Sequence, residues 1–256
     1  MIHLLWRGLS VEIFKTRRTL SIILTFLAPL VMAFLELVIG MQYGTRMYRP
    51  GGDAWMTLIQ HIQIMWTLLL MPLFITLEMG LLGAMEHNNK TWKQIFALPL
   101  PRWVVYAAKQ FTGLLLVALS SLFLAAFTVG VGLCIRCIEP DLGFNAPIPW
   151  SSLGQNLLYP FLAAWLIVAI HVWVSLRWSS FVLAMGVGIA ATVAGVLVFS
   201  EKWAYYYPWT IPGMVTFDLI NGDSPLFSIL AGVLGGIGMA CFGCWDVSRR
   251  DVHCES

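Results

Sequence analysis

Six long stretches of the chain are apolar and almost free of charge, and they constrain the fold more than any other feature. They run roughly over 19–40, 62–84, 108–134, 156–176, 181–199 and 226–245. Each is close to the ~20 residues that a helix needs to cross a bilayer core about 30 Å thick. Hydrophobic residues make up 59% of the chain and charged residues only 11%, which is too much apolar surface for a soluble core. The sequence therefore predicts an all-helical membrane protein with six spans.

The segment before the first span, residues 1–18, has a helical pattern of its own. Apolar residues recur at helical spacing at Ile2, Leu5, Leu9 and Ile13, while polar residues take another face. This pattern is typical of an amphipathic helix that lies in the membrane interface. We expect the whole chain to form one transmembrane domain that begins with an in-plane helix.

The basic residues predict how the six spans are oriented. Eleven of the fifteen lysines and arginines fall on the side that holds both termini, whereas Arg46, Arg49, Arg136 and Lys202 fall on the other side. Because cytoplasmic loops carry the excess of Lys and Arg, both termini are predicted to be cytoplasmic. The outer loops are then about 41–61, 135–155 and 200–225, and the inner ones are 85–107 and a short turn at 177–180.

Tryptophans lie near most predicted span ends, where indole rings favour the level of the lipid headgroups. The residues in question are Trp55, Trp103, Trp150, Trp178, Trp203, Trp209 and Trp245. We interpret them as an interfacial belt.

Several functional classes are disfavoured by what the sequence does not contain. The dipeptide Gly-Lys is absent, so there is no phosphate-binding loop and we expect no ATP hydrolysis by this chain itself. No H-E-x-x-H or G-x-S-x-G motif occurs, which argues against a metalloprotease or a hydrolase. The pairs Cys134/Cys137 and Cys241/Cys244 are expected at opposite membrane faces, so no metal site is predicted. A net charge of +2 gives no reason to expect nucleic-acid binding, and lipid is the predicted environment.

The most informative stretch is the predicted inner loop between the second and third spans. It reads Glu86-His87-Asn88-Asn89-Lys90-Thr91-Trp92-Lys93, then Ala97-Leu98-Pro99-Leu100-Pro101-Arg102, with Tyr106 and Lys109 following. A second stretch, Tyr207-Pro208-Trp209-Thr210-Ile211-Pro212, precedes the sixth span. With the in-plane helix and six spans, these motifs resemble the type-2 ATP-binding-cassette (ABC) permeases. The resemblance covers essentially the whole chain and is greatest to subunits of lantibiotic and bacitracin self-immunity exporters.

The resemblance implies one half of an exporter in the bacterial inner membrane. Two such subunits, identical or related, would dock on separate ABC ATPase subunits and move a hydrophobic or amphipathic cargo outward. ATP and Mg²⁺ would be bound by the ATPase, and the permease would need no cofactor. The expected coupling residues are Glu86, Lys90, Thr91, Trp92, Lys93, Phe96 and Arg102, and the expected outer gate is Tyr207, Pro208, Trp209 and Pro212.

The physical pattern of the inner loop agrees with a docking role. If residues 91–97 are helical, Trp92 and Phe96 fall at positions i and i+4 beside Lys93, as an anchor for a partner's groove requires. The alternative is that Trp92 and Trp103 are belt residues and that the lysines only follow the positive-inside rule.

Two acids fall inside apolar runs, Glu36 in the first span and Glu78 in the second. Intramembrane acids are costly, so both are candidates for a cargo path. Alternatively, Glu36 reaches the headgroups or pairs with Arg46 or Arg49, and Glu78 is protonated or hydrogen-bonded. His171 in the fourth span is interpreted as an interhelical contact.

Other functions remain as alternatives to peptide self-immunity. The cargo of an ABC exporter could instead be a lipid or a drug. In a different class, an intramembrane enzyme or scaffold would use Glu36, Glu78 and His171, and it would require the three groups to converge. An ion-coupled carrier would show repeats or broken helices, and Met71-Pro72 is the one hint of a kink.

Overall fold

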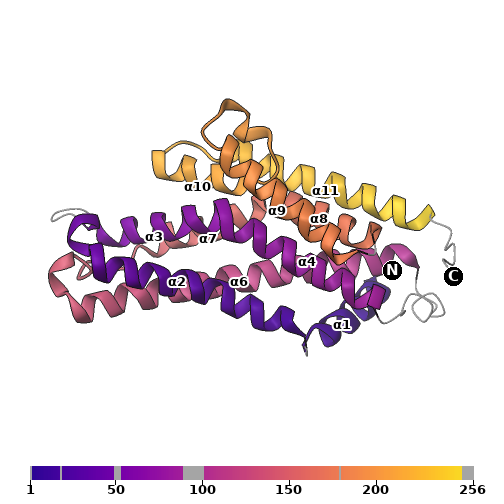
Figure 1. Cartoon of the computed structure of the whole chain (residues 1–256), viewed down its shortest axis with the longest axis horizontal. Coiled ribbons are helices and arrows are strands. Elements are labelled where there is room, and N and C mark those ends of the chain that lie inside the picture. The colour runs from indigo at the N-terminus through magenta and orange to yellow at the C-terminus, as the bar shows by residue number, and fades with distance from the viewer. Residues whose placement is uncertain (1, 18, 49–52, 89–100, 179, 250–256) are drawn as a thin grey trace.

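A computed structural model of the chain describes residues 2–17, 19–48, 53–88, 101–178 and 180–249, and these ranges hold helices and no strand. Figure 1 shows an elongated bundle in which α1 and the C-terminal end of α11 lie at the same end of the molecule. In chain order the elements are α1 (Ile2–Thr16), α2 (Leu20–Met47), α3 (Ala54–Met65), η1 (Trp66–Leu70), α4 (Met71–Asn88), α6 (Arg102–Ile138), η2 (Pro140–Leu142), α7 (Trp150–Ala163), α8 (Trp165–Arg177), α9 (Phe181–Val198), η3 (Lys202–Tyr206), α10 (Ile211–Asn221) and α11 (Leu226–Arg249).

Six stretches of helix are long and apolar enough to cross a membrane, which confirms the predicted all-helical, six-span fold. They are Leu20–Met47, Ala54–Met85, Trp103–Ile138, Trp150–Arg177, Phe181–Val198 and Leu226–Arg249. A short turn is found between the fourth and fifth spans, as predicted, since α8 ends at Arg177 and α9 begins at Phe181; its place on the inner side stays a prediction. Helices α2 and α6 extend past the predicted spans because hydropathy marks where charge appears, whereas helical hydrogen bonding continues into the more polar sequence.

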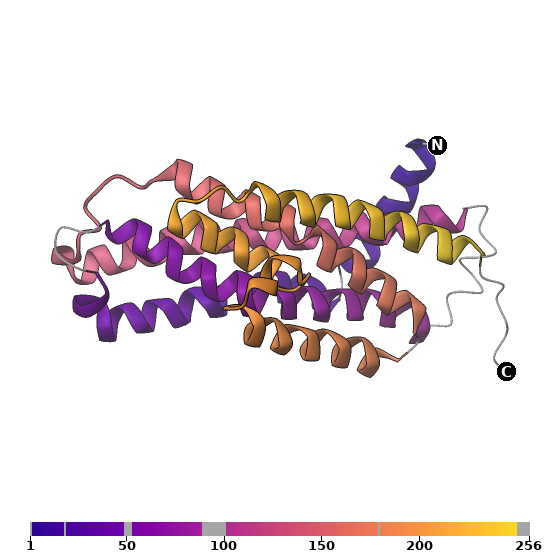
Figure 2. The same ribbon diagram turned by 90° about the horizontal axis from the view of Figure 1, so that it is seen from above.

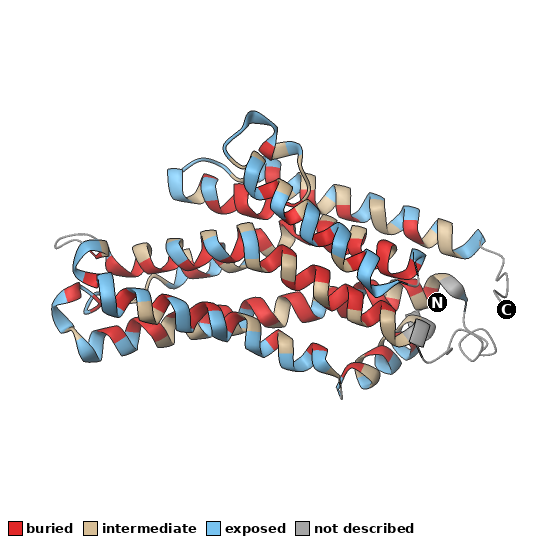
Figure 3. Cartoon of the chain, viewed as in Figure 1, coloured by how far each residue is buried: buried red, intermediate tan, exposed pale blue. Residues whose placement is uncertain are grey.

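Large apolar side chains cover much of the surface of the bundle. Phe34 on α2, Leu197 on α9 and Leu234 on α11 are all more than half exposed. Figure 3 shows the buried residues on the facing sides of the helices and the exposed ones on the outside. Lipid is the solvent that suits such a surface, and the chain is a multi-pass membrane protein.

The second span is interrupted near its middle by the π-helical segment η1. Two residues after its end comes Pro72, which has no amide hydrogen and whose ring crowds the carbonyl of Leu68, inside η1. One wide turn relieves this crowding, as π-bulges commonly do within helices. The kink expected at Met71-Pro72 is therefore present as a π segment. The fourth span is also divided, into α7 and α8 at Ala164, and the sequence did not predict this break.

The region 200–225, which we predicted to be an outer loop, contains the short helices η3 and α10. Helix α10 ends at Gly222, whose φ of 76° lies in the left-handed region that favours glycine. All of its first six residues are buried, and it packs against α7 and α11. The segment is therefore folded onto the bundle. Helix α10 has only eleven residues, among them Thr216, Asp218 and Asn221, so it was too short and too polar to be predicted as a span.

Small residues allow the later helices to pack closely within one subunit. On α11, Gly232 lies against the backbone of Ala163 and Gly236 lies against Trp165. On α9, Gly188 contacts the side chains of Thr76 and His171. Figure 2 shows α8 between α9 and α11, which is the arrangement that these contacts support. The small-residue faces are thus used for packing inside the subunit.

The predicted tryptophan belt is only partly correct. Trp150, Trp203 and Trp245 are more than half exposed, as belt residues should be. Trp55 is 1% exposed, however, and its indole Nε1 donates to the Ala146 carbonyl over 3.0 Å. Trp209 is also buried. These two residues lie at span ends in the sequence but point into the protein, because connecting segments fold over them.

Candidate coupling and cargo sites

The predicted coupling segment joins α4 to α6 at the end of the bundle that also holds α1 (Figure 1). Glu86 lies in the last turn of α4, and Arg102 is the first residue of α6. The other expected coupling residues, Lys90, Thr91, Trp92, Lys93 and Phe96, lie outside the described residues. The structure therefore describes the frame that holds this segment, and the coupling assignment stays a prediction.

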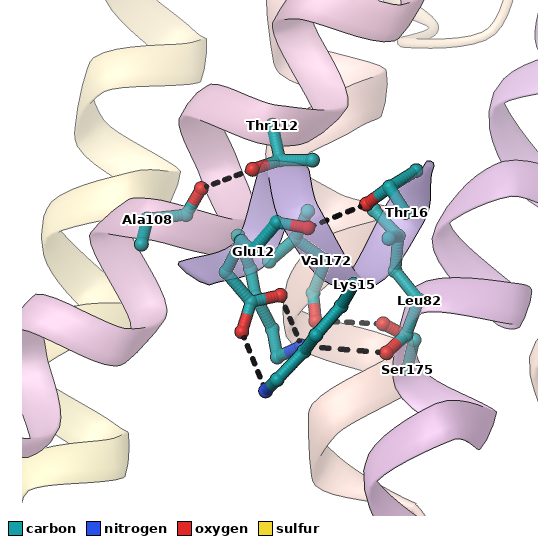
Figure 4. A network of polar contacts seen from close by, with 9 residues as sticks. Glu12, Lys15, Thr16, Leu82, Ala108, Thr112, Val172 and Ser175 are labelled. Atoms are coloured by element: carbon teal, nitrogen blue, oxygen red, sulfur yellow. Dashed lines mark hydrogen bonds and ion pairs between the residues drawn. The ribbon is translucent and has the colours of Figure 1, made fainter. Parts of the chain in front are cut away.

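A buried charge network occupies that frame. Lys109, in the second turn of α6, is 1% exposed, and its Nζ donates to Glu12 Oε2 on α1 over 2.9 Å. The same Nζ lies 3.4 Å from the Leu82 carbonyl oxygen on α4. Lys15 binds the other carboxylate oxygen of Glu12 at 3.1 Å. Figure 4 shows Glu12 from α1, Leu82 from α4 and Ser175 from α8 gathered around this network.

Helix α1 is therefore tied to the helices that carry the coupling segment. Gly8, Glu12 and Thr16 fall on one face of α1 at a spacing of four residues, and all three are buried. The Thr16 hydroxyl donates to the Glu12 carbonyl over 2.7 Å. A carboxylate removed from water needs such partners, since an unpaired buried charge is costly. The sequence analysis did not single out Glu12, although an acid next to the apolar stripe that contains Leu9 and Ile13 was a signal for it.

Glu36 of α2 lies in the wall of a groove between α2 and the second span. Its side chain is 3% exposed, and its Oε1 lies 3.7 Å from His61 Nδ1 on α3. The groove has a volume of about 370 Å³, and its other lining residues are Met32, Leu35, Ile39, Met47, Ile64, Met65, Leu69 and Leu70. Glu36 thus faces a histidine in an apolar groove. The expected pairing with Arg46 is not found, because the helix directs Glu36 toward α3; Arg49 lies outside the described residues.

Glu78 and His171 have different surroundings from Glu36 and from each other. Glu78 is fully buried, neither carboxylate oxygen has a hydrogen bond within the described part of the chain, and Ser21 of α2 lies beside it. His171 is hydrogen-bonded to the Thr76 hydroxyl at 3.2 Å and meets the Trp209 ring edge-on. His171 is thus an interhelical contact, as expected. Because the three groups have separate neighbours, their contacts give no support to a shared catalytic site.

The expected outer gate residues belong to the folded segment between α9 and α11. The Tyr207 hydroxyl donates to the Ala191 carbonyl of α9 over 2.9 Å, and the Trp209 ring lies 5.5 Å from that of Tyr207. Pro208 is half-buried, and Pro212 is buried in the first turn of α10. These residues form a plug against α8 and α9. Its role as an outer gate stays a prediction.

A hydrogen bond of 2.6 Å from the Tyr205 hydroxyl to Asp218 Oδ1 joins η3 to α10 within the same segment. The hydrogen bond to Asp218, with partial burial, raises the pKa of Tyr205 to about 12. Burial also raises the pKa of Asp218, although the bond from Tyr205 opposes that shift. The Tyr205 hydroxyl therefore keeps the proton that it donates throughout the physiological pH range.

Six long apolar helices, with buried polar groups gathered at the end that holds α1 and in one side groove, define a multi-pass membrane protein. Residues 8–195 match the family described as ABC-2 family transporter protein, and the chain belongs to this family. It is thus a membrane subunit of an ABC transporter, and the family implies an ABC ATPase as its partner. The match runs from α1 through most of α9. No curated protein and no solved structure gave a match.

Proposed function

We propose that this subunit works as one half of an exporter that moves a hydrophobic or amphipathic cargo out of a bacterial inner membrane. Both termini face the cytoplasm, and a second copy or a related permease completes the pathway. ATP binding brings the two partner ATPase subunits together. Closure pushes residues 85–103, and the push tilts the spans and opens the 200–225 plug outward.

The observation that carries this proposal is the network of Glu12 and Lys109. It joins α1, α4 and α6 at the inner end, directly beside the segment that resembles the coupling loop of type-2 permeases. Separating a buried charge pair is costly, so a displacement of one helix is passed to the other helix through the pair. Movement of α6 at Lys109 therefore carries α1 with it.

The test is the affinity of the permease for its ATPase. Trp92→Ala removes an aromatic anchor worth about 2 kcal/mol or more, so binding should weaken about thirtyfold or more. Trp178→Ala is the matched control, because Trp178 also lies at the inner end but outside the coupling segment. Normal ATPase binding and full transport by Trp92→Ala would contradict the coupling role.

We further propose a peptide antibiotic as the cargo, with self-immunity as the physiological role. The Thr91-Trp92-Lys93 motif and the Tyr207-Pro208-Trp209 motif support this choice, since they resemble the lantibiotic and bacitracin immunity branch. Co-expression with the ATPase should raise survival on a lantibiotic or on bacitracin. Unchanged survival together with export of a lipid or drug would favour the alternative cargo.

A further inference from the structure

The groove between α2 and α3 combines features that packing alone does not explain. One is an acid that is almost completely buried and yet lines an open, apolar space. Another is the π segment η1, which contributes Leu69 and Leu70 to the lining. π-bulges are often found at functional sites, where the wide turn reshapes a surface. The π segment thus helps to form the groove, and Glu36 makes one point of its apolar wall polar.

Glu36 is not satisfied by its protein neighbours. The 3.7 Å between its Oε1 and His61 Nδ1 is longer than a hydrogen bond, and Oε1 has no hydrogen-bond donor among the described residues. A carboxylate in an apolar membrane environment is costly without a donor or a cation. A positively charged hydrogen-bond donor that enters the groove would supply the missing donor and the missing cation together.

The remaining lining is suited to a flexible apolar chain. Met32, Met47 and Met65 contribute side chains that adapt to irregular shapes, and the other members are leucines and isoleucines. A volume of about 370 Å³ falls within the usual range for small-molecule sites. Leu35 and Met65 are largely exposed at the rim, so the groove opens to the side of the bundle.

We infer that this groove binds an apolar chain bearing a protonated amine, with the ammonium group held by Glu36 and the chain lying against the methionines and leucines. The ammonium donates to the carboxylate oxygen that lacks a donor, and His61 lies at the polar end of the site. An alkylamine has this chemistry, and so does a lysine side chain within an amphipathic peptide. The inference rests on the proposed export function, because it names the class of cargo that the subunit accepts.

The test uses photo-labelling of the purified permease in lipid nanodiscs, without its ATPase. The probe is dodecylamine carrying a diazirine in its chain, and the reference probe is the matching dodecanol. Labelled peptides are identified by mass spectrometry. The amine should label the groove at about tenfold lower concentration than the alcohol, because a charge-assisted hydrogen bond is stronger than a neutral one.

Three variants separate the contributions of charge and shape. Glu36→Gln should remove the tenfold preference for the amine. Glu78→Gln is the matched control, since it makes the same change at an intramembrane acid outside the groove lining, and it should keep the preference. If Glu36→Gln fails to fold, Met65→Trp at the exposed rim provides the second test, because the larger ring should block labelling by both probes.

Two results would overturn the inference. Equal labelling by amine and alcohol would mean that the groove takes any apolar chain, as a lipid-filled surface does. Absence of labelling, together with disulfide formation between copies of a Leu35→Cys variant, would mean that a second subunit covers the groove. Neither result involves the ATPase, so failure here is distinguishable from failure of the export function, which would show as lost ATPase binding or transport.

Discussion

Replacing Lys109 with methionine should uncouple α1 from the rest of the bundle. Methionine keeps most of the length of the lysine stem but removes the ammonium group. Glu12 then loses its 2.9 Å partner and retains Lys15, whose side chain is 29% exposed and therefore partly screened. The Leu82 carbonyl also loses its contact with Nζ.

The magnitude follows from the burial of both partners. The side chains of Lys109 and Glu12 are 1% and 5% exposed, and breaking such a pair by removing one partner costs about 3–5 kcal/mol. Because Lys15 still neutralises Glu12 in part, we expect about 3 kcal/mol for Lys109→Met. The double variant Glu12→Gln/Lys109→Met removes both charges of the buried pair, and Lys15, which also binds Glu12, is 29% exposed and can be solvated, so the double variant should recover much of that loss.

The assay combines reversible unfolding in mixed micelles with a distance measurement. Spin labels at the exposed positions Ser10 and Phe111 report the separation of α1 from α6. Lys109→Met should broaden that distance distribution, and the double variant should narrow it again. If the single variant unfolds like the wild type with α1 in place, or if the double variant loses the sum of both single effects, the buried pair does not hold α1.

Three further predictions test the topology and the packing. In a variant whose native cysteines are replaced by serine, because Cys134 and Cys137 are free and exposed, cysteines introduced at Gly51 and Ser224 should react with an impermeant thiol reagent outside intact cells and one at Asn88 should not; outside labelling at Asn88 would overturn the orientation. Gly232→Ala should lower stability in thermal unfolding by about 1–3 kcal/mol because its Cβ meets the Ala163 backbone, whereas Gly238→Ala, with nothing within 4 Å, should not. Tyr205→Phe should speed amide hydrogen exchange over residues 202–221 at neutral pH, because the hydroxyl that donates to Asp218 is lost; equal exchange in both proteins would show that the bond is unimportant.

The spans could be predicted from sequence because their cause is local. Crossing a bilayer requires an uninterrupted apolar helix, and each of the six stretches meets that condition by itself. Pro72 also acts locally, by crowding the carbonyl of Leu68, so the kink in the second span was visible in advance. Pro160 would crowd the carbonyl of Asn156, which stays inside α7, so this local rule does not account for the break at Ala164.

The pairings within the sites could not be predicted because their cause is tertiary. Glu12 and Lys109 are 97 positions apart, and nothing in either segment specifies the other. His61 lies one residue before the predicted second span, so its approach to Glu36 depends on how α2 and α3 pack. Trp55 and Trp209 have belt positions in the sequence but are covered by neighbouring segments, which hydropathy does not report.

The unequal lengths of the spans have a consequence for the surrounding lipid. At ~1.5 Å per residue, the eighteen residues of α9 reach about 27 Å, whereas the thirty-seven of α6 reach about 55 Å. A hydrocarbon layer about 30 Å thick is slightly too thick for α9, and a short hydrophobic segment is accommodated by local thinning of the bilayer. The bilayer should therefore be thinnest on the side of the subunit where α9 lies, next to the Tyr207 and Trp209 plug. Acyl-chain length in the host membrane then acts directly on the part of the protein proposed to open.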